Sequence, residues 1–297
     1  MMAGIAKKTA LGPVALVMLG LLNGCATVPT SARTNVSSKT IAYFLRPGQG
    51  PTVVFQSGLG DGKAVWAKVI ERMPESASLF AYDRPGYGDS PGASEARNPC
   101  AISRELRELL RSAGLAPPYL LVGHSLGGLY QFCYAKLFPQ DVAGLVLLDP
   151  THPNHWARMK NDAVVQAAII ESLRIAAFSR VMRQEFDDQA GCIDELDRSM
   201  PLALPTRLLF SGQFQLAEKG AFEKMARSLR EEWLGLFSNE RHSEVSDSGH
   251  YIQKEAPDAV VGAIQSVIAK SNNAINPDSK KRYAFVAPPF AVGYGER

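Results

Sequence analysis

The stretch Gly123-His124-Ser125-Leu126-Gly127 places a serine between two glycines at the end of an apolar run. Residues 119–122 are predicted to form a short buried strand, and the apolar spacing after Gly128 predicts a helix. A serine on such a sharp strand-to-helix turn needs small neighbours, because the backbone passes close to it. The free N–H groups at the start of the helix can stabilise a developing negative charge. The pattern therefore predicts an exposed, nucleophilic Ser125.

A serine hydroxyl is a weak nucleophile until a base accepts its proton. His250 is the candidate base, because it lies late in the chain, after the last predicted strand, in the loop Ser246-Asp247-Ser248-Gly249-His250. A helical stretch follows this loop. The other four histidines are His124, within the serine turn, and His152, His155 and His242.

Strands and helices alternate along most of the chain. Strands are predicted at 41–45, 52–56, 78–82, 119–122, 142–148, 206–210 and 240–245, and helices at 64–73, 102–112, 219–237 and 257–269. This alternation predicts an α/β fold with a mostly parallel, doubly wound sheet. Residues 151–205 interrupt it with helical stretches at 162–182 and 184–197, which predicts a helical cap over the site.

The region from about Thr40 to Lys270 resembles the α/β-hydrolase superfamily. The resemblance rests on the serine turn followed by Gly128 and on the loop Asp83-Arg84-Pro85-Gly86-Tyr87-Gly88-Asp89-Ser90, which is typical of its esterase and haloperoxidase-like branches. It implies the α/β-hydrolase fold, with Ser125 as nucleophile and His250 as base. We interpret Asp83 and Arg84 as residues that hold loops rather than as catalytic groups.

The third member of the expected triad is harder to place. Many members of the superfamily carry an acid shortly after the strand that corresponds to 206–210, but this chain has Gln215 there. Some branches place the acid after the preceding strand, which here ends in Asp149. The order Ser125, Asp149, His250 also fits the superfamily. Asp149 is therefore the predicted acid, with Glu218 and Asp247 as alternatives.

Two backbone N–H groups are expected to form an oxyanion hole. One belongs to Leu126, directly after the nucleophile. The other is expected in Ser57-Gly58-Leu59-Gly60, after strand 52–56, where many relatives have His-Gly. The Gly-x-Gly pattern permits the sharp turn, so the resemblance implies the N–H of Leu59 as the second donor.

The N-terminus carries export signals. Lys7 and Lys8 precede an apolar run over residues 10–22 that is short for a membrane span and predicts a signal peptide. Leu22-Asn23-Gly24-Cys25 resembles a bacterial lipobox, which implies lipidation of Cys25. Ala26, rather than Asp, implies sorting to the outer membrane, facing the periplasm.

Composition sets further limits. With 46% hydrophobic residues, 21% charged residues and a net charge of +3, the 297-residue chain has ordinary globular composition, and nothing favours nucleic-acid binding. The spacing of the cysteines matches no metal site. A Cys100–Cys192 bridge is possible in an oxidising compartment, whereas Cys133 is expected in the core.

These observations divide the chain into five parts. They are a signal peptide (1–24), a flexible tether (25–39), a hydrolase core (40–150 and 206–270), a cap (151–205) and an unassigned tail (271–297). The resulting hypothesis is an exported, lipid-anchored serine hydrolase that cleaves a small ester-like substrate without metal or organic cofactor. The alternatives are acyl transfer, lactone or amide hydrolysis, perhydrolysis, or a non-catalytic scaffold lipoprotein.

Overall fold

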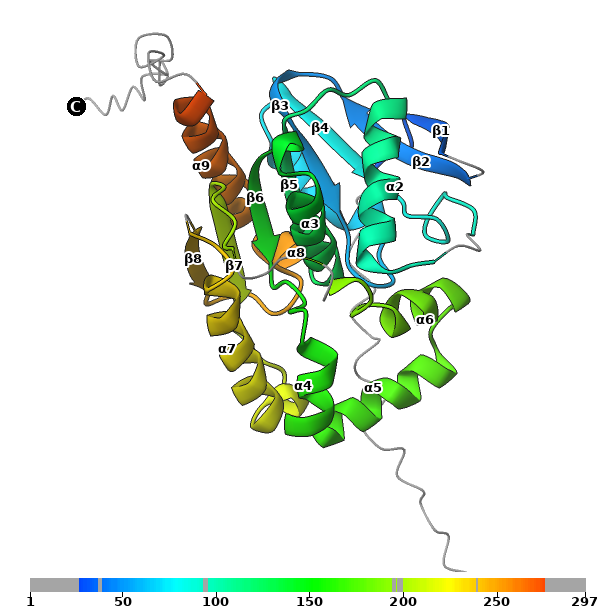
Figure 1. Cartoon of the computed structure of the whole chain (residues 1–297), viewed down its shortest axis with the longest axis vertical. Coiled ribbons are helices and arrows are strands. Elements are labelled where there is room, and N and C mark those ends of the chain that lie inside the picture. Colours follow the sequence, from blue (N-terminus) through cyan, green and yellow to red (C-terminus); the bar gives the residue numbers. More distant parts are fainter. Residues whose placement is uncertain are drawn as a thin grey trace, which may run out of the picture.

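The computed structural model describes residues 27–275, except 37–38, 93–95, 194–195, 197–199 and 239 (Figure 1). The predicted signal peptide and Cys25 lie outside the described residues. So does most of the predicted tail, although its first residues extend a helix to Ile275. Within the described ranges, no helix is both long and apolar enough to cross a membrane.

Eight strands form one sheet, in the order β1-β2-β4-β3-β5-β6-β7-β8. β1 and β2 run antiparallel to their neighbours, and the other strands are parallel. The prediction of a mostly parallel sheet is therefore confirmed. The strands are β1 (Ala32–Val36), β2 (Lys39–Arg46), β3 (Gln49–Gln56), β4 (Ala77–Tyr82), β5 (Tyr119–His124), β6 (Val142–Leu148), β7 (Thr206–Ser211) and β8 (Glu240–Val245).

The prediction of a flexible tether over 25–39 is wrong for β1. Ala32 to Val36 pair with β2, and the Val36 side chain lies in the core. The polar composition of this segment hid the strand, because an edge strand can leave alternate side chains in water. The segment is held by pairing with β2 rather than by its own apolar content.

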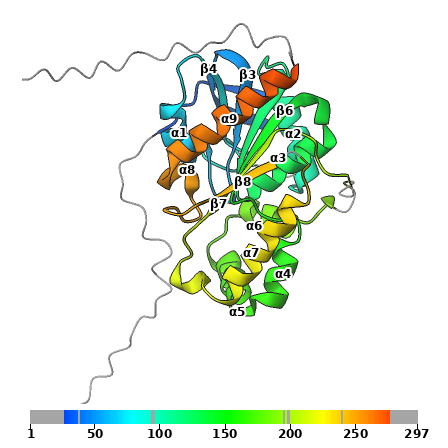
Figure 2. The same cartoon turned by 90° about the vertical axis from the view of Figure 1, so that its left-hand side faces the viewer.

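Helices cover both faces of the sheet (Figures 1 and 2). Strand residues alternate between the faces: Val54 and Leu121 pack with α2 (Pro99–Ser112) and α3 (Leu126–Leu137), and Val53 and Leu120 with the opposite layer. That opposite layer contains α1 (Ala67–Arg72), which follows the 3-10 turn η2 (Lys63–Trp66), together with α8 (Ile252–Glu255) and α9 (Pro257–Ile275). A further 3-10 turn, η3, spans Pro139–Asp141.

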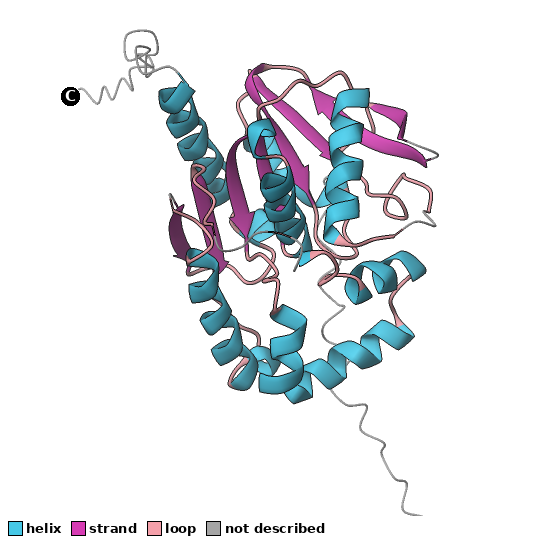
Figure 3. Cartoon of the chain, in the orientation of Figure 1, coloured by secondary structure: helices cyan, strands magenta, loops and turns pink. Residues whose placement is uncertain are grey.

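The segment after β6 forms a helical layer beyond the end of the sheet (Figure 3). Its helices are α4 (His155–Asp162), α5 (Val164–Ala176) and α6 (Arg180–Asp187), and no strand occurs in the described part of 151–205. α7 (Ala221–Leu234), which follows the 3-10 turn η5 (Leu216–Glu218), joins this layer, because Met225 and Leu229 pack against Met159, Ala163 and Ala167.

Two links fasten α6 and the chain after it to the core. Cys192 forms a disulfide with Cys100 at the start of α2. Glu185 of α6 is fully buried, and its carboxylate pairs with Arg84 at 3.0 Å and with Arg97 at 2.9 Å. Because a buried carboxylate is costly without partners, these ion pairs fix where α6 lies on the core.

Candidate active site

Ser125 lies on a tight turn between β5 and α3. Its backbone has φ 53° and ψ −122°, a strained conformation for a residue with a side chain. Neither flanking glycine could carry a side chain. A Cβ on Gly127 would lie 2.3 Å from the Gln56 carbonyl oxygen, and one on Gly123 would lie 2.5 Å from the Gly127 carbonyl oxygen. The glycine spacing therefore serves close packing of α3 against the ends of β5 and β3.

The two expected oxyanion donors lie near this turn. Leu126 is the first residue of α3, so its N–H has no partner within the helix. The loop that carries Leu59 approaches Ser125 closely, since a Cβ on Gly58 would lie 3.1 Å from Ser125 Cβ. No hydrogen bond engages either N–H in the described part of the chain.

Arg84 holds the loop that carries Leu59. Its guanidinium donates to the carbonyl oxygens of Ser57 (2.5 Å) and Gly58 (2.8 Å), and its other hydrogen bonds in the described structure are to Glu185. Asp83 in turn binds the ammonium of Lys63 at 2.7 Å. The interpretation of Asp83 and Arg84 as loop-holding residues is confirmed by these contacts.

His250 lies in the loop between β8 and α8, and its neighbours fix the loop. The His250 carbonyl oxygen lies 2.9 Å from Nε2 of His124, and the carboxylate of Glu255 accepts the Gly249 N–H at 2.6 Å. Burial, followed by the charge of His250, lowers the pKa of His124 to about 3, so that its ring is neutral. His124 therefore ties the histidine loop to the serine turn without adding a charge.

Asp149 contacts the His250 ring. Its Oδ2 lies 2.7 Å from Nδ1 of His250, within the distance expected for a triad acid. Among the described residues, no other carboxylate bonds this ring. Glu218 instead accepts the N–H of Gln215 at 2.7 Å and caps η5, and Asp247 has no hydrogen bond to His250. Of the three predicted candidates, Asp149 is the one that the fold brings to His250.

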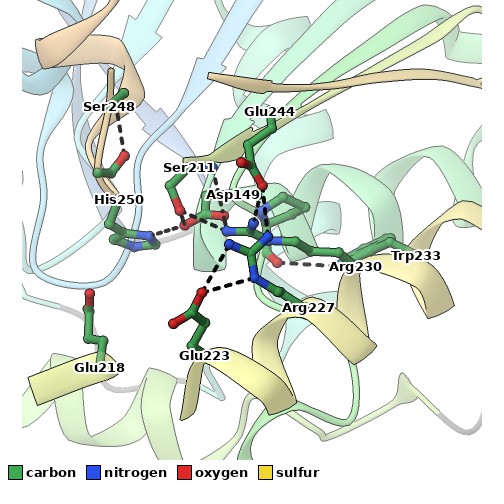
Figure 4. A network of polar contacts seen from close by, with 12 residues as sticks. Asp149, Ser211, Glu218, Glu223, Arg227, Arg230, Trp233, Glu244, Ser248 and His250 are labelled. Carbon is green, nitrogen blue, oxygen red and sulfur yellow. Dashed lines mark hydrogen bonds and ion pairs between the residues drawn. The ribbon is translucent and has the colours of Figure 1, made fainter. Parts of the chain in front are cut away.

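Further groups surround the Asp149 carboxylate, and sequence reasoning missed two of them (Figure 4). Ser211, at the end of β7, donates its hydroxyl to Oδ2 at 3.0 Å, and Arg230 of α7 lies 3.2 Å from Oδ1. Burial disfavours the ionised carboxylate. The bond to His250 and the charges of His250 and Arg230 outweigh burial and lower the pKa of Asp149 well below its usual value.

Ser125 and His250 are linked through His124 rather than by a direct hydrogen bond in the described structure. The ring of His124, adjacent to Ser125, lies 4.6 Å from the His250 ring between centroids. The hydrogen bonds of the described residues include none between Ser125 Oγ and His250. Catalytic hydrogen bonds in unliganded enzymes are often long and tighten when substrate binds.

α4 contributes His155 to the surroundings of His250. Burial, followed by the positive charge of His250, lowers the pKa of His155 to about 4. On the core side, Asp61 lies in the loop after Leu59, and burial raises its pKa. In the described ranges, no group of three or more His, Cys, Asp or Glu side chains could hold a metal ion.

Comparisons with known proteins agree with this architecture. A family model described as the alpha/beta hydrolase fold matches residues 51–172. The chain is 29% identical over 221 residues to YqjL, an uncharacterized protein of Bacillus subtilis (strain 168), covering 73% of this chain and 83% of that protein. It is 24% identical over 245 residues to the monoacylglycerol lipase abhd6-B of Xenopus laevis, covering 68% of this chain and 73% of the lipase.

A solved structure adds evidence on the fold. The epoxide hydrolase CorEH superposes with a TM-score of 0.61 at 18% identity, over 80% of this chain and 98% of CorEH. At this identity the likeness concerns architecture alone. Together with the sheet order and the serine turn, these matches show that the chain has the α/β-hydrolase fold.

Proposed function

We propose that this protein is a serine hydrolase that cleaves ester-like bonds through an acyl-enzyme. The observation that carries the proposal is the 2.7 Å contact between Asp149 and His250, in a loop tied to the strained turn of Ser125. The similarity to a monoacylglycerol lipase supports an ester as the substrate class.

Each residue has a defined role in the proposed reaction. Asp149 accepts the Nδ1–H of His250, which leaves Nε2 free to take the Ser125 proton. The Ser125 oxygen then attacks the ester carbonyl, and the N–H groups of Leu59 and Leu126 stabilise the oxyanion. His250 returns the proton to the departing alcohol, which leaves the acyl group on Ser125. A water molecule, deprotonated by His250, then attacks the acyl carbonyl, and the carboxylic acid leaves as Ser125 regains its proton.

A panel of p-nitrophenyl esters of graded acyl length, from acetate to palmitate, tests this function. We expect saturable hydrolysis of at least one ester, with a preference set by the space between cap and core. A covalent inhibitor that acylates the nucleophilic serine should abolish the activity. Absence of hydrolysis across the panel, by a folded protein, would contradict the ester assignment.

We also propose that the protein is exported and anchored to a bacterial membrane by a lipid on Cys25. The charged start, the short apolar run and Leu22-Asn23-Gly24-Cys25 motivate the proposal. The Cys100–Cys192 disulfide supports it, because disulfides persist in oxidising compartments outside the cytosol. The Ala26 residue after Cys25 favours the outer membrane.

Mass spectrometry of the purified mature protein tests the anchor. We expect an N-terminal peptide that begins at Cys25 and carries the mass of covalently attached acyl chains. A Cys25→Ala variant should lose that mass and appear in the soluble fraction. An unmodified Cys25, or an N-terminus at another residue, would refute the lipid anchor but not the proposed hydrolase activity.

A further inference from the structure

The Asp149 carboxylate lies between His250 and a permanent cation. Its Oδ2 lies 2.7 Å from Nδ1 of His250, and its Oδ1 lies 3.2 Å from Nη2 of Arg230. The same Nη2 donates to the Ser211 hydroxyl at 2.8 Å, and that hydroxyl donates to Oδ2. Figure 4 shows this chain from His250 through Asp149 to Arg230. One carboxylate thus serves two cationic partners when His250 is protonated.

The Arg230 side chain is held in this position. It is 11% exposed, and its guanidinium carbon lies 5.2 Å from the centre of the Phe210 ring and 5.0 Å from that of Phe214. On its outer side, Nη1 lies 3.4 Å from the Glu244 carboxylate, which is 46% exposed. Solvent therefore screens the interaction of Arg230 with Glu244 more than its interaction with Asp149. Glu244 thus neutralises only part of the positive charge that acts on Asp149.

We propose that Arg230 is a positioning residue that limits the proton affinity of His250 by sharing the Asp149 carboxylate. The inference rests on the proposed function, in which a neutral His250 accepts the Ser125 proton. A positive charge on the far side of Asp149 reduces the stabilisation that the carboxylate gives to the imidazolium. His250 then remains neutral, and able to act as a base, at a lower pH.

The other groups around His250 explain why such a limit is useful. Partial desolvation of the ring, whose side chain is 44% exposed, favours its neutral form, but the bond to Asp149 and the charges around it raise the pKa of His250 overall. The charged or titratable groups that face the ring, from every packed element, are Asp61, His124, Asp149, His155, Glu218 and Tyr251. The acids among them all favour the imidazolium, and Arg230 opposes them.

The test is a titration of His250 in the full chain, with ring-¹³C-labelled histidine followed by NMR and His250→Gln used to assign its signal. Arg230→Met removes the charge, so the pKa of His250 should rise by about half a pH unit or more. Arg230→Lys keeps the charge and should retain most of the wild-type value. The acid limb of kcat/KM should move to higher pH in Arg230→Met.

Two further variants make the sign of the effect testable. Glu244→Gln leaves Arg230 less neutralised, so the pKa of His250 should fall. Arg107→Met is the matched control. Arg107 also pairs with an aspartate, Asp141, at 2.7 Å, but Asp141 precedes the first residue of β6, whereas Asp149 follows the last. This variant should leave the titration of His250 unchanged. An unchanged or lowered pKa in Arg230→Met, or equal shifts in Arg230→Met and Arg230→Lys, would overturn the proposal.

Titration and turnover separate the two proposals. The titration needs no substrate, so a protein without ester hydrolysis whose His250 responds as expected would sink the proposed function and leave the assignment of Arg230 standing. If the protein hydrolysed esters but the pKa of His250 did not respond to Arg230→Met, the assignment of Arg230 would fail and the proposed function would stand.

Discussion

Replacement of Ser125 by alanine is expected to lower kcat/KM for ester hydrolysis by at least about a thousandfold, because the triad acts as a unit. The variant should fold normally. The serine hydroxyl makes no hydrogen bond in the described structure, and alanine keeps the Cβ atom that lies near Gly58. The measurement is steady-state kinetics on the best ester of the panel.

The matched control for this experiment is Ser172→Ala. Ser172 lies exposed on α5, where its hydroxyl bonds only the Ala168 carbonyl oxygen one turn earlier. We expect wild-type turnover and an unchanged melting temperature in this variant. If Ser125→Ala retained activity within tenfold of the wild type, Ser125 would not be the nucleophile.

Asp149→Asn is expected to cause the second large loss, of about three to four orders of magnitude in kcat. The amide can donate to Nδ1 of His250, which favours the tautomer that presents Nε2–H, rather than a lone pair, to Ser125. The substitution also removes the more buried of the two carboxylates that pair with Arg230, leaving the exposed Glu244 at 3.4 Å. A lower melting temperature should therefore accompany the loss of turnover.

The alternative acids provide the controls for Asp149. Glu218→Gln and Asp247→Asn should each keep turnover within a few-fold of the wild type, because neither carboxylate bonds the His250 ring. A large loss in either variant, together with a mild effect of Asp149→Asn, would show that another acid orients the histidine in solution.

Much of the site was predictable because it depends on local pattern and on strand order. The glycines around Ser125 are required by contacts to backbone atoms, so the residue types themselves carry the signal. Asp149 directly follows β6, and His250 follows β8. The carboxyl ends of parallel strands meet at one edge of the sheet, which made a contact between them predictable.

The contacts that the sequence did not reveal are long-range. Arg230 lies on a helix rich in charged residues, and nothing in its neighbours distinguishes it from Arg227, which pairs with Glu223 and Glu244. Glu185 meets Arg84 across 101 residues of sequence. Such pairs depend on how the cap docks on the core, and β1 likewise depends on its pairing with β2.

The reaction with a fluorophosphonate probe shows whether Ser125 is an activated nucleophile. We expect one probe adduct per chain, located by peptide mass spectrometry on Ser125. The adduct should be absent in Ser125→Ala and should form far more slowly in Asp149→Asn. If the folded wild-type protein gave no adduct, or an adduct on another residue, Ser125 would not be the activated nucleophile.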